Sequence, residues 1–277
     1  MQGARGGYTI VEVLIVLAVT SALFVAAITV FSGKQGKTQF SQSMQDLNSK
    51  IQSVVSGINV SVFPGAGQYS CTTQSNRPNL GVPVGPGDTT GANGECLFLG
   101  KGIQADTDTT QGHLYIYTVL GSRINPFTGN LATTYLNSNP EPAMGQGACG
   151  LPCDLTEDYS LQFGATIKSS KISTSTSPPS GPTETDLVGF YTSLQTTSNS
   201  GSQTLLSYGY SGFKTKPKLD AQVRQTLENA LPPYSPPTPI EGWYLCVQSG
   251  TSNEMSELVV SSSPAGVTTK VNYGVCS

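Results

Sequence analysis

The chain has 277 residues and a net charge of −3 at pH 7, and only 11% of its residues are charged. Lysine and arginine form no cluster and are not interleaved with aromatic residues, so the sequence does not support a nucleic-acid-binding surface. Gly, Ser, Thr, Asn, Gln and Pro are abundant, which is more typical of secreted β-rich proteins than of cytosolic enzymes.

The first predicted element is an apolar helix at residues 8–31. A helix of this length crosses about 30 Å of hydrocarbon at a rise of about 1.5 Å per residue. A cleaved secretory signal is the alternative, but such a signal carries its small-residue cleavage site after the apolar run. Here the small residues close a leader at residues 1–7, before the run begins. We therefore expect a transmembrane helix that the mature protein retains.

Glu12 is the one charged residue in this apolar run. An ionised carboxylate in hydrocarbon is costly unless a cation pairs with it, and without a partner it tends to protonate. One interpretation is a hydrated glutamate near the membrane interface that is merely tolerated. The other is a carboxylate that pairs with a cation.

The second predicted element continues the helix over residues 32–58. Apolar residues recur there at steps of three and four, which places one stripe on one helical face: Phe40, Met44, Leu47, Ile51, Val54, Val55 and Ile58. The opposite face is polar, so this half is an amphipathic helix in water. Gly33 and Gly36 mark either a flexible point in one rod or a break between two helices, because two glycines cost a helix about 2 kcal/mol.

The segment GGYTIVEVLIVLAVTSALFVAA, at residues 6–27, resembles the N-terminus of type IV pilins and of the pseudopilins of type II secretion. In that family a prepilin peptidase cuts after a glycine, the new N-terminal aromatic residue is methylated, and the fifth mature residue is glutamate. The resemblance implies cleavage after Gly7, N-methylation of Tyr8, and an assembly role for Glu12 as partner of a neighbour's new α-amino group. Two departures are Tyr8 in place of the usual Phe and Thr29 where the family often has proline.

The resemblance also implies a pilin-like fold and a structural function. The chain would be a single-pass membrane precursor, then a subunit of a surface filament that serves adhesion, twitching motility, DNA uptake or secretion. Its partners would be other pilins, in a homo- or hetero-polymer, the prepilin peptidase and the inner-membrane assembly platform. A minor pilin or tip adhesin that binds a ligand or primes assembly is the alternative. A membrane-tethered enzyme is the rival from another class.

Residues 59–277 are expected to form an extracytoplasmic β-rich domain. Short β-rich runs predict strands at 96–103, 113–121, 186–194, 204–213, 242–249, 256–262 and 268–276. A mostly antiparallel sheet built from them would pack on the apolar stripe of the helix, giving an α+β fold.

Three other stretches are expected outside this sheet. Residues 63–96 form a long surface loop rich in Gly, Pro, Asn and Thr. Residues 168–186, rich in Ser, Thr and Pro, form an exposed loop. Residues 217–239 offer a second helix that prolines end.

The cysteines are even in number and all follow the apolar run, which indicates disulfides on the oxidising side of a membrane: Cys71, Cys96, Cys149, Cys153, Cys246 and Cys276. Six cysteines allow about 15 pairings, so spacing alone leaves the connectivity open. We expect each cysteine to pair with its nearest neighbour in the chain. The Cys246–Cys276 loop would then occupy the position of the C-terminal disulfide region of pilins.

No catalytic or cofactor-binding set emerges. His113 is the only histidine and no pair of Cys-x-x-Cys knuckles exists, so neither a Ser/His/Asp arrangement nor a zinc site is expected. The CGLPC segment at 149–153 is one residue too long for a redox Cys-x-x-Cys motif. Asp106 and Asp108 resemble the start of a calcium loop that lacks its distal glutamate, and turn residues are favoured. We expect no enzyme, no cofactor and no metal.

Overall fold

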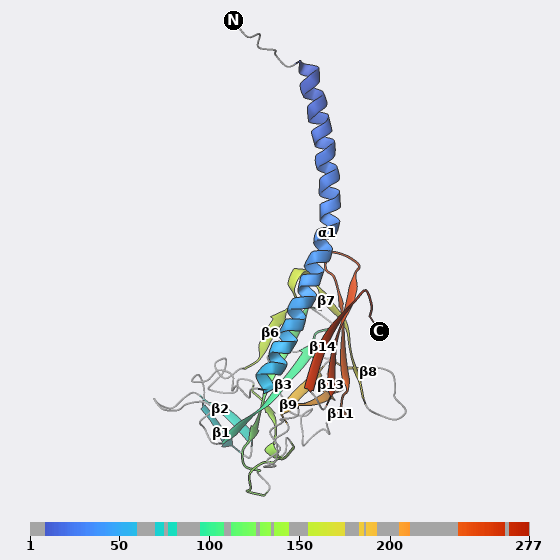
Figure 1. The fold of residues 1–277 in the computed structure, drawn as a ribbon. Coiled ribbons are helices and arrows are strands. Elements are labelled where there is room, and N and C mark those ends of the chain that lie inside the picture. Colours follow the sequence, from blue (N-terminus) through green and yellow to red (C-terminus); the bar gives the residue numbers. More distant parts are fainter. Residues whose placement is uncertain are drawn as a thin grey trace.

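The computed structural model describes residues 9–59, 70–74, 77–81, 95–107, 112–125, 128–133, 136–143, 155–174, 183–185, 187–192, 205–210, 238–263 and 266–276. It has an α+β fold in which one long N-terminal helix extends from a domain of antiparallel sheets (Figure 1). The N-terminal half of the helix projects away from that domain, and its C-terminal half lies against it.

Helix α1 spans Ile10–Asn59 without interruption, which corresponds to about 75 Å at about 1.5 Å per residue. It passes through both Gly33 and Gly36, so the first of the two expectations, one continuous rod, is the observed one. At Gly36 a Cβ atom would lie 3.1 Å from Thr251 Oγ1. The absent side chain thus gives a loop of the domain close access to the helix.

The predicted apolar stripe of α1 is confirmed as core. Each of its seven residues, from Phe40 to Ile58, is buried, and Met44, Leu47 and Ile51 are completely so. These side chains belong to one hydrophobic cluster with residues from both large sheets, among them Ile103, Trp243 and Leu258. The domain therefore folds around this half of the helix.

The first sheet has the strand order β11-β10-β9-β3-β4-β5, and β6 also pairs with β4. The bounds of its strands are β3 Cys96–Ala105, β4 His113–Ser122, β5 Glu141–Pro142, β6 Glu157–Ser160, β9 Leu187–Thr192, β10 Leu205–Tyr210 and β11 Thr238–Pro239. The short 3-10 helix η1, Leu136–Ser138, follows β4. All described pairings in this sheet are antiparallel.

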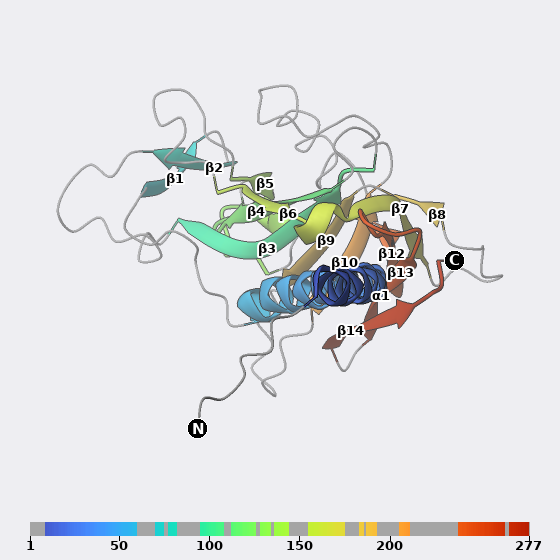
Figure 2. The ribbon, with the colours of Figure 1, turned by 90° about the horizontal axis from the view of Figure 1, so that it is seen from above.

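The second sheet has the order β14-β13-β12-β7-β8. Its strands are β7 Thr166–Ser173, β8 Thr183–Glu184, β12 Gly242–Gln248, β13 Met255–Ser263 and β14 Gly266–Tyr273. A separate hairpin joins β1 Ser70–Gln74 to β2 Arg77–Gly81. Helix α1 contacts strands of both large sheets, and β3 and β14 flank it (Figure 2).

The seven β-rich runs predicted from the sequence are all strands, corresponding to β3, β4, β9, β10, β12, β13 and β14. Two loop predictions are wrong in part. The stretch 63–96 contains the β1–β2 hairpin, and the stretch 168–186 contains most of β7 together with β8. The helix predicted at 217–239 lies outside the described residues except for its last two, which form β11.

Strand β7 escaped prediction because its buried face contains a serine. Ile167, Ser170 and Ile172 are buried in this strand, which pairs with β12 at the middle of its sheet. The hydroxyl of Ser170 accepts a hydrogen bond from the indole N–H of Trp243 at 2.9 Å. That bond satisfies a buried donor and removes the cost of burying the serine.

Candidate functional site

The N-terminal half of α1 is an exposed apolar surface. Residues Ile10–Ile28 have a mean hydropathy of 2.6, and none of this span is buried. Its large side chains, such as Leu17 and Phe24, are more than half exposed. Among the described residues this is the one helix long and apolar enough to cross a membrane. Water is therefore an unfavourable environment for this half of the helix.

Glu12 lies in the first turn of α1. Its backbone N–H donates to Thr9 O at 3.1 Å and to Thr9 Oγ1 at 3.3 Å, so Thr9 caps the helix. The Thr-x-x-Glu spacing is that of a capping box. This motif is present in the sequence but was not identified from it. A carboxylate in the first turn is also favoured by the helix dipole. The Glu12 carboxylate itself is exposed and has no partner within the described part of the chain.

Two adjoining loops, here called the collar, contact α1 where the helix enters the domain. We define it as η3, Gln162–Gly164, and the loop of residues 249–254. The hydroxyl of Ser43 donates to Gln162 O at 3.1 Å. The collar thus fixes the angle at which the rod leaves the domain.

The loop of residues 249–254 is held by its own polar groups and by an ion pair to the helix. Ser249 Oγ accepts the backbone N–H groups of Thr251 and Ser252, at 3.2 and 3.1 Å. Lys37 Nζ lies 2.8 Å from Glu254 Oε1. The hydrogen bond to Glu254 and its charge raise the pKa of Lys37. Beside this pair a groove of about 720 Å³ opens, lined by residues that include Phe40, Met255 and Tyr273.

Strand β6 fastens the lower part of the helix to the first sheet through polar contacts. Tyr159 donates its hydroxyl to Asp46 Oδ2 at 2.6 Å, and burial together with this bond raises the pKa of Tyr159. Glu157 forms an ion pair with Lys50 of α1 and a longer one, at 3.9 Å, with Lys101 of β3. Burial lowers the pKa of Lys101. The helix is therefore anchored by charge as well as by its apolar stripe.

His113 occupies a structural position in β4. Its Nδ1 lies 2.7 Å from Asp158 Oδ1, and its ring stacks on Tyr115 with centroids 6.0 Å apart. The contact with Asp158 joins the side chains of β4 and β6, which also pair through their backbones.

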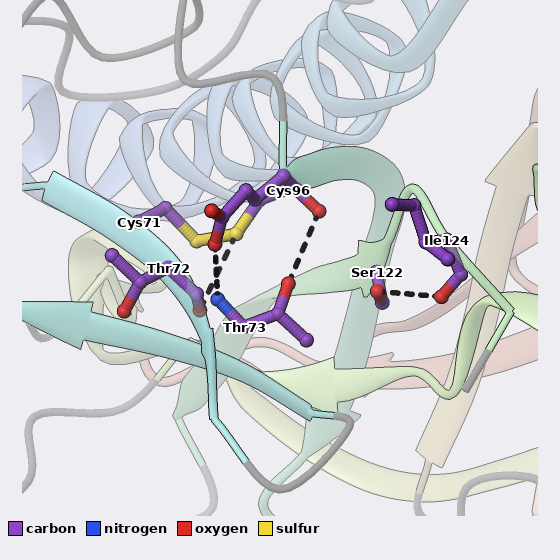
Figure 3. Close-up of a disulfide and its surroundings, with 7 residues drawn as sticks. Cys71, Thr72, Thr73, Cys96, Ser122 and Ile124 are labelled. Atoms are coloured by element: carbon purple, nitrogen blue, oxygen red, sulfur yellow. Dashed lines mark hydrogen bonds between the residues drawn. A yellow bond between two sulfur atoms is a disulfide. The ribbon is translucent and has the colours of Figure 1, made fainter. Parts of the chain in front are cut away.

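Two disulfides tie loops to the sheets. Cys71 of β1 is bonded to Cys96 of β3 with 6.1 Å between Cα atoms, and Glu95 Oε2 accepts the Thr73 N–H at 2.7 Å beside it (Figure 3). Cys246 of β12 is bonded to Cys276 near the end of the chain, with 5.4 Å between Cα atoms. Both pairs match the expected connectivity. The third expected pair, Cys149 with Cys153, lies outside the described residues.

An exposed apolar pair lies at the end of the domain away from the N-terminal half of α1. Ile124 and Leu131 face each other in an antiparallel bridge and are 51% and 65% exposed. Hydrogen bonds from Asn125 N to Asn130 O and from Ala132 N to Arg123 O flank the bridge, so the two side chains form a closely spaced non-hydrogen-bonded pair. Arg123 N also bonds to Glu95 O, next to the Cys71–Cys96 disulfide. Sequence reasoning did not single out this pair.

The remaining predicted site residues are accounted for as follows. Gly7 and Tyr8, the expected cleavage and methylation site, lie outside the described residues, as does Asp108. Asp106 follows β3 and is buried, with its N–H bonded to His113 O at 3.0 Å. Within the described residues no three His, Cys, Asp or Glu side chains gather as metal ligands.

The chain matches no protein-family model, and no curated protein or solved structure is significantly similar to it. The resemblance to pilins therefore rests on the residues of the N-terminal segment.

Proposed function

We propose that this chain is a structural subunit of a type IV pilus or a related filament. The precursor spans a membrane through residues 8–31 and is cleaved after Gly7 by a prepilin peptidase, and its Tyr8 becomes the methylated N-terminus. The assembly platform then extracts the mature chain into a polymer of this and other pilins. The filament serves adhesion, motility, DNA uptake or secretion.

One observation carries the proposal: a single continuous helix exposes an apolar span at Ile10–Ile28 and buries one face of its C-terminal half in a domain. The exposed half needs an apolar environment, because surface of this extent does not remain in water. A bilayer supplies that environment before assembly, and the same halves of other copies supply it within a polymer. The rod passes from one environment to the other without refolding.

The surroundings of the Glu12 carboxylate differ between the bilayer and the polymer. In the precursor it lies near one end of the span, where water and headgroups reach it. In a bundle of helices the carboxylate leaves water and needs a cation. Cleavage after Gly7 creates one, the α-amino group of Tyr8, which precedes Glu12 by four positions in the sequence. An incoming chain then offers its amine to the Glu12 of a neighbour, which favours one axial register.

The domain suits the coat of such a filament. Its core is anchored on α1 by apolar packing, by the Lys37–Glu254 pair and by the contacts of β6, and disulfides close two of its loops. Forces on the coat therefore pass directly to the helix. Closing a loop of about 30 residues contributes on the order of 3 to 4 kcal/mol.

The test is whether the chain is found along surface filaments. Surface filaments are sheared from cells, purified and labelled with an antibody against residues of the domain. Label along the whole filament is the expected result. Absence of the chain from every filament fraction, together with an enzymatic activity of the domain, would overturn the proposal.

One observation favours the second candidate, a minor or tip subunit that binds a ligand. The Ile124–Leu131 pair is apolar, exposed and flanked by backbone hydrogen bonds. Ile124 lies in the region of the Cys71–Cys96 disulfide (Figure 3), and strand β1, which holds Cys71, lies at the end of the domain away from the membrane span (Figure 1). Label confined to filament ends would support this candidate over the bulk subunit.

A further inference from the structure

The charges of α1 flank its apolar half, one sign at each end. Glu12 stands at the start, no residue from 13 to 33 is charged, and Lys34 and Lys37 follow. Lys37 has a partner within the domain, since Glu254 lies 2.8 Å away. Lys34 is exposed, and neither its ammonium group nor the Glu12 carboxylate has a partner within the described part of the chain. One unpaired charge of each sign is therefore left on the rod.

The position of Lys34 runs against the usual charge bias of membrane proteins. Lysine and arginine close to a span favour the cytoplasmic side, yet the leader carries only Arg5 while Lys34 and Lys37 follow the span on the opposite side. The ion pair with Glu254 explains the presence of Lys37 on this side of the span. Lys34 opposes the orientation that the proposed function requires, and its ammonium group makes no contact within the described residues that would offset this.

We propose that Lys34 of one copy pairs with Glu12 of a second copy, displaced along the filament by about 33 Å. The inference rests on the proposed function. The displacement follows from the 22 positions between the two residues at about 1.5 Å per residue in an unbroken helix. Copies inserted in one orientation pack in parallel, so sliding one along another by this distance brings the opposite charges side by side.

The contact deepens the role of Glu12. A carboxylate has two oxygens and accepts several hydrogen bonds, so the amine of one neighbour and the ammonium of another can share it. The amine sets a short displacement of about one helical turn, and Lys34 sets the long one. Two fixed displacements define a helical lattice more tightly than one does.

The test is a charge exchange in the full-length chain. Glu12→Lys and Lys34→Glu each place like charges together, and each is expected to lower the yield of sheared filaments at least about tenfold per mature subunit in the membrane. The double variant restores opposite charges between positions 12 and 34 but not between position 12 and the amine, so its yield should exceed that of Glu12→Lys at least about threefold without reaching that of wild type. Normalising to mature subunit removes effects on insertion and cleavage.

The matched control combines Glu12→Lys with Lys37→Glu, three positions away. This variant removes the Lys37–Glu254 pair and is not expected to restore filaments. If Glu12 acts only through the helix cap and dipole, Lys34→Glu cannot compensate for its loss, and the double variant stays as poor as Glu12→Lys. That result, or rescue by the Lys37 exchange instead, overturns the pairing while wild-type filaments keep the proposed function intact. If the wild type forms no filaments, both fall.

Discussion

The same substitution on the two halves of α1 should affect different properties: the stability of the domain in one half and the yield of filaments in the other. Leu47 is 0% exposed in the domain core, and Leu17 is 60% exposed on the apolar half. Leu47→Ala removes three buried carbons, worth about 2.4 kcal/mol of transfer free energy at about 0.8 kcal/mol each, and leaves a cavity. The total loss of unfolding free energy should be about 3 to 5 kcal/mol. Leu17→Ala should change it by less than about 0.5 kcal/mol, because no contact of the domain is lost.

Trp243 provides the assay. It is the only tryptophan, it is completely buried, and its ring lies 6.2 Å from that of Phe190. Its fluorescence during denaturant unfolding of the detergent-solubilised full-length chain therefore reports the core. Leu17→Ala should instead lower filament yield, since under the proposed function its side chain packs only in the polymer. Equal destabilisation by the two variants would refute the division of α1 into a domain half and an assembly half.

Four further outcomes are expected. Glu12→Val should leave membrane insertion intact and reduce filaments, and a wild-type yield would count against the assembly role. Gly7→Leu should leave uncut precursor in membranes by mass spectrometry, whereas normal processing would refute the cleavage site. Replacing Cys246 and Cys276 with serine should lower the free energy of unfolding by about 3 to 4 kcal/mol, measured by Trp243 fluorescence. An unchanged midpoint of the denaturant transition would contradict this. The pKa of Tyr159 is raised in the folded state, so this tyrosine ionises first in the unfolded chain, above about pH 10. The free energy of unfolding of wild type should therefore fall by up to about 1.4 kcal/mol per pH unit relative to that of Tyr159→Phe. Parallel dependences of the two unfolding free energies on pH would contradict this.

Strong periodicity made most of the fold predictable. The stripe from Phe40 to Ile58 repeats over five turns, so both the helix and its buried face follow from the sequence. The strand at 113–121 is rich in β-branched and aromatic residues, and the strand at 256–262 is centred on a Leu-Val-Val run; both appear where expected. Helix propensity alone could not decide whether α1 continues through Gly33 and Gly36, because the continuity of the helix depends on the domain contacts around Gly36.

The elements that escaped prediction depend on distant partners. Strand β6 reads EDYS, which has no β pattern, and its side chains are satisfied by Lys50 and Asp46, which lie 107 and 113 positions away. Strand β7 buries Ser170 because Trp243 donates to it from another strand. Local sequence does not contain these pairings. The Thr9 cap, by contrast, was legible in the sequence.

Under the proposed function, this chain becomes a filament subunit by losing its leader. The most direct measurement is intact-protein and N-terminal peptide mass spectrometry of the chain recovered from purified, sheared filaments. We expect a chain that begins at an N-methylated Tyr8 and retains the apolar helix. A filament fraction without the chain, or one that holds it with residues 1–7 still attached, would overturn the proposed function.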